Sequence, residues 1–246
     1  MKLFKFFTLV LGLSVFQINL LHAEEPLAFD TELLSTLKEP YKITDYFLLL
    51  PPSVFEGNLP KADFSTAMRK KILTLETLGD SLDNEAAFYT EIKDEKNGYL
   101  SFLSNTDGEN EKIEIAIFKE VNFPTLVAVS STHTSKIYFL KFENKQWVNL
   151  TETLWPKLSY TNFLKAEPTP ELAKKLEGLF LITTLPRLGK TITISIPLET
   201  WKDLELPARQ LTEDETKEFL GLLQYRSLGL EFEKDKFVVV KKAPFK

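Results

Sequence analysis

Few side chains in this sequence have the types and spacing that enzyme chemistry needs. The chain has two histidines and no cysteine, and only His133 lies beyond the N-terminal apolar segment, in the polar run Ser-Ser-Thr-His-Thr-Ser. A Ser-His-Asp triad would have to use His133 as its base, but no Gly-x-Ser-x-Gly turn accompanies it. A structural zinc site needs several histidine or cysteine ligands. We therefore interpret His133 as a polar loop residue and expect no metal or cofactor.

Three short motifs match parts of known sites without completing them. Ser35-Thr-Leu-Lys38 has the Ser-x-x-Lys spacing that brings an amine near a hydroxyl on a helix, but no Ser-Asp-Asn accompanies it. Gly189-Lys190-Thr191 ends like a phosphate loop, yet the first glycine of that motif would fall on Thr184, so we predict a β-turn. Asn105–Asn110 has the oxygen side chains and glycine of a calcium loop, but Leu103 occupies the first ligand position. We predict a solvated hairpin loop there.

Paired carboxylates are the next candidates, because two acids roughly 5 to 9 Å apart hydrolyse glycosides. One stretch of the chain is dense in acids, and we interpret it as solvated loops between elements. Its members are Asp80, Asp83, Glu85, Glu91, Asp94 and Glu95.

Aromatic side chains give the only ligand-binding candidates. The chain has 20 Phe but three Trp, and phenylalanine favours cores whereas exposed tryptophan favours binding surfaces. Trp147 falls in a predicted hairpin, so we expect it in the core. Trp155 and Trp201 fall in irregular stretches, and we predict that they are exposed and contact a ligand.

The N-terminal residues 1–23 have the pattern of a secretory signal peptide. Two lysines precede an apolar run from Phe6 to Phe16, and Leu21-His22-Ala23 ends the segment on a small residue. No later apolar stretch reaches the roughly 18 to 20 residues that span a bilayer. We expect a periplasmic or secreted chain beginning at Glu24, without a membrane span, disulfides or a lipid anchor. An uncleaved N-terminal anchor is the alternative.

The composition and net charge of the chain disfavour some classes of binding partner. The hydrophobic share of 43% and charged share of 26% are typical of a globular protein. The net charge of −5, with no basic run, disfavours nucleic acid and anionic lipid as partners.

The helices and strands expected from the sequence predict an α+β fold rich in antiparallel meanders. Helices are expected at Phe64–Leu78 behind Asp63, at 170–177 behind Thr169, and from Thr212 to Tyr225. In the first helix, we expect Arg69-Lys70-Lys71 on the outer face. The third begins at a capping box, Thr212-Glu-Asp-Glu215. Tyr41–Leu50 reads as a strand or an inserted apolar segment. The other segments predicted as strands are Phe88–Lys93, Tyr99–Ser104, Lys112–Phe118, Thr125–Ser130, Lys136–Phe142, Gln146–Leu150, Leu179–Thr184, Thr191–Ile196, Leu228–Phe232 and Phe237–Lys241.

The two halves of the chain share a pattern that suggests an internal repeat. Three segments align in order at similar offsets: 98–104 with 178–184, 112–117 with 190–195, and 140–148 with 230–238. We predict two related helix-plus-meander units, 24–155 and 156–246, which can pack as one domain. The alternative is that any two β-meanders share alternation and charged turns.

Asn97-Gly-Tyr-Leu100, the hairpin Tyr138–Trp147 and Leu185-Pro-Arg-Leu-Gly189 resemble stretches of uncharacterised exported bacterial β-rich proteins. The similarity covers residues 88 to 246. It implies a bacterial envelope or secreted β-rich protein and assigns no catalytic residue.

Together these observations favour a non-enzymatic binding or interaction protein of the bacterial cell envelope, with an envelope protein or glycan as partner. The alternative is a carboxylate- or serine-based hydrolase that acts on envelope polymers or glycans.

Overall fold

The computed structural model describes residues 27–56, 64–75, 88–106, 109–119, 125–132, 136–177, 179–198 and 211–245. The predicted signal peptide, His133 and Trp201 lie outside these ranges. Within them, two antiparallel sheets of six and four strands are combined with short helices. The predicted α+β, β-rich class is therefore confirmed.

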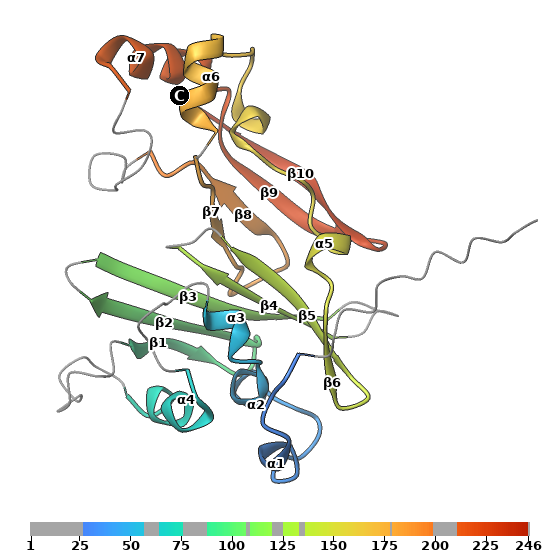
Figure 1. Ribbon diagram of the computed structural model, residues 1–246. Helices are drawn as coiled ribbons and strands as arrows, with labels where there is room; N and C mark the ends of the chain where they lie inside the picture. The colour runs from blue at the N-terminus through green and yellow to red at the C-terminus, as the bar shows by residue number, and fades with distance from the viewer. Residues whose placement is uncertain are drawn as a thin grey trace, which may run out of the picture.

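The larger sheet is a meander in which each strand pairs with the next along the chain (Figure 1). The strands are β1 (Phe88–Asp94), β2 (Tyr99–Thr106), β3 (Glu109–Phe118), β4 (Leu126–Ser131), β5 (Ile137–Glu143) and β6 (Gln146–Asn149). The β5–β6 turn uses Asn144 and Lys145, both at positive φ. Two such residues form the tight turn whose twist matches that of antiparallel strands.

The smaller sheet has the order β10-β9-β8-β7. Its strands are β7 (Ile182–Thr184), β8 (Ile192–Ser195), β9 (Tyr225–Glu233) and β10 (Lys236–Pro244). Helix α7 (Glu213–Leu222) lies between β8 and β9 in the chain and begins at the predicted capping box. There Thr212 accepts from the Glu215 N–H at 3.2 Å, and the Glu215 carboxylate accepts from the Thr212 N–H at 2.7 Å.

The remaining helices are short. Among the described residues, four precede the first strand: α1 (Thr31–Leu34), α2 (Ile43–Leu49), α3 (Ser53–Glu56) and α4 (Thr66–Ile72). Three lie between the sheets in sequence: α5 (Thr151–Leu154), the 3₁₀ helix η2 (Tyr160–Phe163) and α6 (Pro170–Leu176). The Thr169-Pro170 start predicted for α6 is observed.

Of the two alternatives predicted for Tyr41–Leu50, the strand was wrong, because Ile43–Leu49 form helix α2. The Asp45 carboxylate accepts a 2.9 Å hydrogen bond from the Lys42 N–H and so begins the helix. Ile43 and Phe47, one turn apart, are fully buried. A continuous apolar run carries no periodicity that separates a buried helix from a buried strand.

Helix α4 also differs from its prediction. Ser65 begins it, and its hydroxyl accepts from the Met68 N–H at 3.4 Å. Asp63, the predicted cap, lies outside the described residues. Arg69, predicted on the outer face, is 1% exposed. Its Nη1 donates to the Phe47 and Leu50 carbonyls at 2.7 and 2.5 Å, so Arg69 binds free carbonyls at the end of α2.

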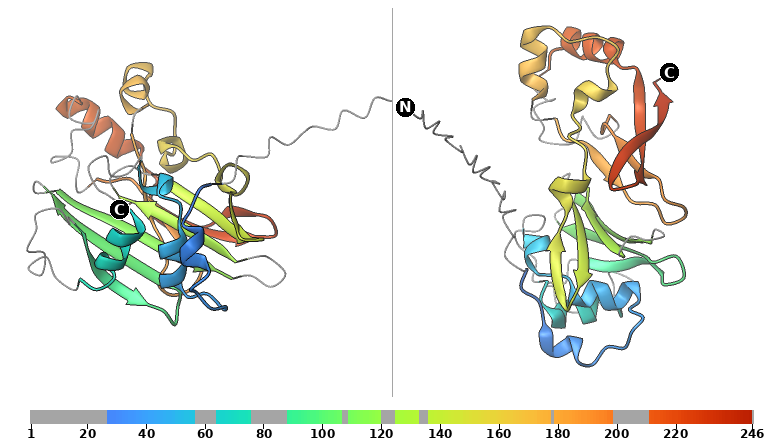
Figure 2. Two further views of the ribbon diagram at one scale, coloured as in Figure 1. Left: turned by 60° about the horizontal axis from the view of Figure 1, so that its bottom comes forward. Right: turned by 90° about the vertical axis from the view of Figure 1, so that its right-hand side faces the viewer.

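The molecule is built in layers (Figures 1 and 2). Helices α1, α2 and α4 lie against one face of the six-stranded sheet, and the four-stranded sheet lies against the other. Ile113 and Ile115 on β3 face the helices, whereas Ala116 and Phe118 face the second sheet. Strand β4 is buried at every position because the sheet is covered on both sides.

The core between the sheets contains residues from both predicted units. Phe139 on β5 packs against Phe237 on β10 with ring centroids 4.5 Å apart. On the helix side, Trp147 is 1% exposed, and its indole N–H donates to the Leu49 carbonyl at 2.8 Å. The expectation that Trp147 belongs to the core is confirmed. The predicted boundary at residue 155 falls between the sheets in sequence and stays a prediction.

The sheets differ in the connectivity that a strict repeat requires. The aligned segments fall on β2, β3 and β5–β6 in one sheet and on β7, β8 and β9–β10 in the other. Strand β4 separates β3 from β5, whereas β8 pairs directly with β9. Since neighbours are antiparallel, β3 and β5 run parallel to each other while β8 and β9 run in opposite directions. This difference argues against a strict repeat of strand order and direction, and the two related helix-plus-meander units stay a prediction.

Candidate functional site

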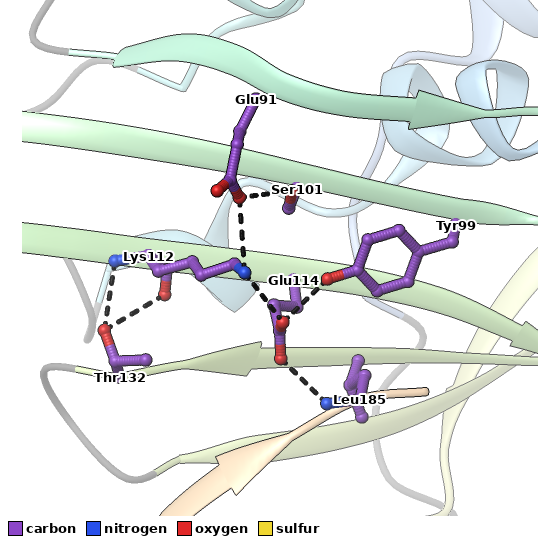
Figure 3. A network of polar contacts seen from close by, with 7 residues as sticks. All are labelled: Glu91, Tyr99, Ser101, Lys112, Glu114, Thr132 and Leu185. Atoms are coloured by element: carbon purple, nitrogen blue, oxygen red, sulfur yellow. Dashed lines mark hydrogen bonds and ion pairs between the residues drawn. The ribbon is translucent and has the colours of Figure 1, made fainter. Parts of the chain in front are cut away.

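A charged group is buried between the two sheets (Figure 3). Glu114 on β3 is 2% exposed, and its Oε1 accepts from the Tyr99 hydroxyl on β2 at 2.7 Å. Its Oε2 accepts from the backbone N–H of Leu185, just after β7, at 2.7 Å. Both oxygens of the carboxylate therefore accept hydrogen bonds, and the carboxylate links the two sheets.

Lysine 112 balances the charge of Glu114. Its Nζ lies 3.3 Å from Glu114 Oε1 and 3.2 Å from Glu91 Oε2, and Glu91 also accepts from Ser101 at 2.8 Å. The backbone N–H of Lys112 donates to the Thr132 hydroxyl at 3.0 Å. We call this group, with Tyr99 and the Leu185 N–H, the Glu114 network.

The Glu114 network has the residue types of a catalytic site but not its electrostatics. Burial alone would lower the pKa of Lys112, but Glu114 and Glu91 raise it above its ordinary value, so the amine stays protonated and is no base. Burial, together with Glu114, raises the pKa of Tyr99. Ser101 and Ser130, cross-strand neighbours of Glu114, are at most 1% exposed. A substrate cannot reach either hydroxyl. We therefore assign the Glu114 network a structural role, in which it joins the two sheets.

Trp155 lies beside an open cavity. The cavity has a volume of about 550 Å³ and is lined by the segment after α5, by η2, by Glu177 just after α6, by the segment that leads into β7, and by one residue each of β7 and β8. Trp155, Tyr160 and Phe180 give its aromatic lining. We call it the Trp155 cavity. Its size lies within the roughly 300 to 1,000 Å³ of small-molecule sites.

The Trp155 indole is held by the core and is only partly covered. Its ring packs against Phe139 and Phe237, with centroid distances of 5.4 and 5.9 Å. The side chain is half-buried, so part of it faces the cavity. An aromatic surface fixed in this way loses little conformational entropy when a ligand packs on it.

Polar groups complete the described lining of the Trp155 cavity. Ser159 and Thr161 contribute hydroxyls, and Glu177 contributes the single carboxylate among the described lining residues. Burial, together with the nearby Glu177 charge, raises the pKa of Tyr160, so its phenol is a neutral hydrogen-bonding group. This combination of apolar surface and few polar groups can orient an amphipathic ligand.

The short motifs do not form sites. Ser35 follows the last residue of α1, and its hydroxyl donates to the Glu32 carbonyl at 2.7 Å, so Ser35 and Lys38 do not share a helix. Gly189 has φ +82° in the turn between β7 and β8, as predicted, and Lys190 and Thr191 both bind Glu231. The side chains of Asn105–Asn110, where we predict a solvated hairpin loop, lie outside the described residues.

The acidic stretch separates into individual contacts. Glu91 binds Lys112, Asp94 binds Arg187 at 2.8 Å, and Glu95 binds Lys42 at 2.9 Å. Asp80, Asp83 and Glu85 lie outside the described residues. In the part of the chain that the structure describes, no three acidic or histidine side chains cluster closely enough to hold a metal ion.

Sequence reasoning missed the Glu114 network, although a signal for it was present. The run Lys-Ile-Glu-Ile-Ala-Ile-Phe places Lys112 and Glu114 on the same face as Ala116 and Phe118. Because Ala116 and Phe118 are apolar, this face is expected to pack against another element at their end of the strand. The alternating isoleucines predict burial of the opposite face.

Comparison with known proteins supports the fold. The chain is similar to a solved structure described as a domain of an uncharacterized protein from Porphyromonas gingivalis W83, with a TM-score of 0.52 and 16% identity. The match covers 80% of this chain and 97% of that one. No protein-family model matches the chain, and no curated protein matches its sequence. At this identity the similarity concerns the fold alone.

No helix within the described ranges has both the length and the apolar composition needed to cross a membrane.

Proposed function

We propose that this protein is a non-enzymatic binding protein of the bacterial cell envelope and that it holds a glycan in the Trp155 cavity. The observation that carries the proposal is the half-buried Trp155 indole, fixed on one side by Phe139 and Phe237 and facing an open cavity of about 550 Å³. The envelope location rests on the signal-peptide pattern of residues 1–23.

A glycan fits the chemistry of this cavity. The C–H face of a sugar ring is apolar and packs on an aromatic ring, while its hydroxyls need hydrogen-bonding groups at the edge. Trp155 and Tyr160 supply the aromatic surface, and Ser159, Thr161 and Glu177 supply the polar groups. These groups favour a neutral sugar or an amino sugar, because the O–H and N–H groups of such a ligand can donate hydrogen bonds to the Glu177 carboxylate.

At two acids of the candidate acidic stretch, Asp94 and Glu95, the protonation state favours binding over hydrolysis. A general acid needs a raised pKa. Hydrogen bonds from Asn97 and Arg187 lower the pKa of Asp94 to about 2, and Lys42 lowers that of Glu95. Both groups are therefore ionised at neutral pH and held by cations, which suits ion pairing and not proton donation.

The test is a calorimetric titration of the protein with soluble peptidoglycan fragments. We expect binding, and we expect Trp155→Ala to weaken it about 30-fold, as the loss of an aromatic anchor worth about 2 kcal/mol. Because Trp155 also packs on the core, Thr161→Arg, an exposed change that obstructs the cavity, is the second variant. The control is Tyr138→Ala, a half-buried aromatic outside the cavity lining.

Three results would contradict the proposal. One is equal affinity of Thr161→Arg and the wild type for the fragments. Another is release of new reducing ends during incubation, which would indicate hydrolysis. The third is failure to bind any fragment in the titration. Location is tested separately by fractionation and N-terminal sequencing, which we expect to find Glu24 first in periplasm or medium; an intact Met1 in the cytoplasm would contradict it.

A further inference from the structure

A second cavity, of about 670 Å³, is lined by segments that are distant in sequence. They are Lys38–Ile43 before and at the start of α2, the β1–β2 turn 95–98, the end of β3 at 117–119, and the β7–β8 turn at 189–190. The two turns are joined next to the cavity, where Arg187 Nε binds Asp94 Oδ2 at 2.8 Å. Folding of both sheets and the N-terminal segment is therefore needed to form this cavity.

The lining of this cavity is strongly positive. It contains five lysines and two glutamates, and we call it the lysine cavity; its charged members are Lys38, Lys42, Lys96, Lys119, Lys190, Glu39 and Glu95. Lys42 pairs with Glu95 at 2.9 Å, and Lys190 pairs at 3.1 Å with Glu231, which is not in the described lining.

Three of the five lysines are available to a ligand. Lys38, Lys96 and Lys119 are exposed and form no ion pair with any residue in the described part of the chain. They stand in a chain whose net charge is −5, so the positive surplus is local. A concave surface with one sign of charge concentrates ligands of the opposite sign.

A smaller cavity of about 310 Å³ adjoins the lysine cavity. The two cavities share the wall formed by Glu39-Pro40-Tyr41 and Lys119, and the second one adds Lys145 and Glu143, so the positive surplus belongs to the lysine cavity. Tyr41 packs edge-on against Tyr46 and Phe142, with ring centroids 5.8 and 5.9 Å apart. The wall is therefore packed against the core of the sheet and is preformed.

We infer that the lysine cavity binds an organic phosphate ester. Lysine ammonium groups are compact charges with rotatable donors, and they suit the oxygens of a phosphate group, which carries about −1.5 to −2 charge at neutral pH. The volume is that of a small-molecule site rather than of a single ion. Tyr41 and Ile117 in the lining are partly exposed and give the organic part an apolar surface. This inference does not depend on the proposed function.

The experiment compares glucose 6-phosphate with glucose by calorimetry at low and high salt. We expect the wild type to bind the phosphate ester and not glucose, with affinity falling as salt screens the charges. Lys38→Gln/Lys96→Gln/Lys119→Gln should weaken binding about tenfold or more, since three positive charges are removed from the lining of the cavity. The matched control is Lys157→Gln/Lys165→Gln/Lys174→Gln, which removes three exposed lysines outside the cavity and changes the net charge equally.

A second arm separates a soluble ester from a lipid headgroup. Phosphatidylcholine vesicles with and without phosphatidic acid are sedimented with the wild type and both triple variants. Binding that needs phosphatidic acid and Lys38, Lys96 and Lys119 supports the same site with a lipid as source. Equal loss in the two triple variants would overturn the inference, as would absence of binding in both arms. Circular dichroism checks that the variants are folded.

Discussion

Glu114 on β3 accepts a 2.7 Å hydrogen bond from the backbone N–H of Leu185, 71 residues later in the chain. This contact connects the six-stranded sheet to the segment that leaves β7 in the four-stranded sheet. A backbone donor between two covered sheets has no water to bind, so the carboxylate satisfies it. Glu114 is therefore a structural link.

Replacing Glu114 with glutamine should destabilise the protein by about 2 to 3 kcal/mol. Glutamine keeps one acceptor oxygen, but its amide would direct donors toward the Tyr99 hydroxyl or the Leu185 N–H, and Lys112 would lose a charge partner. Urea unfolding monitored by circular dichroism measures the change. Glu143→Gln, which breaks an exposed pair with Lys141, should cost at most about 1 kcal/mol. Equal losses in the two variants would show that Glu114 is not a structural link.

Replacing Arg69 with methionine should cost about 3 kcal/mol, because the Phe47 and Leu50 carbonyls at the end of α2 would lose their donor in a buried site. Thermal unfolding gives the comparison with Lys70→Met, an exposed neighbour on the same helix. Near-neutral behaviour of Lys70→Met together with a large loss for Arg69→Met is expected. A neutral Arg69→Met would contradict the assigned role.

Asp94 should make stability depend on pH in acid. Hydrogen bonds from Asn97 and then Arg187 lower its pKa to about 2, below the ordinary 3.8. A carboxylate with a lowered folded-state pKa stabilises the protein above its unfolded pKa, and this contribution is lost as pH falls from about 4 toward 2. Asp94→Asn should remove that part of the pH dependence in urea titrations.

The control for Asp94 is Asp235→Asn in the β9–β10 turn, where the carboxylate forms no ion pair among the described residues. This variant should keep the acid dependence of the wild type. An NMR titration of Asp94 that gives an ordinary pKa would contradict the prediction directly.

Two glycines should respond to alanine in opposite directions. Gly98 has φ +67°, and an added Cβ would lie 3.1 Å from Ile117 Cβ, so Gly98→Ala should cost about 1 to 2 kcal/mol. Gly221 lies in α7 with open space around it, so Gly221→Ala should stabilise by about 0.5 to 1 kcal/mol. Denaturant midpoints of the two variants should move apart; a shared direction would contradict the assigned geometry.

The strands were predictable from the sequence because their alternation and turns are local signals. The hairpin Tyr138–Trp147 and the Thr212 capping box were predicted in this way, and both are observed. Helix α2 was not, since its run of apolar residues is compatible with either element and the covering by β2 and β3 settles its burial.

The candidate sites were only partly predictable. Trp155 was selected because it lies in an irregular stretch with a type of side chain that favours binding. The cavity beside it depends on η2, α6 and β7, which lie in other parts of the chain. The lysine cavity had no sequence signal, since its lysines are scattered from Lys38 to Lys190 and each alone reads as a solvated charge.

The sequence by itself determined most of the strands, the starts of α6 and α7, the absence of disulfides and the α+β class, because alternation, caps and turn residues act over a few neighbours. Only the tertiary structure decided that Glu114 and Arg69 are buried, that β4 separates β3 from β5, and which lysines share a cavity. These features depend on which face of one element covers another. Such packing joins residues as distant in the chain as Lys38 and Lys190, and patterns over a few neighbours do not specify which residues meet.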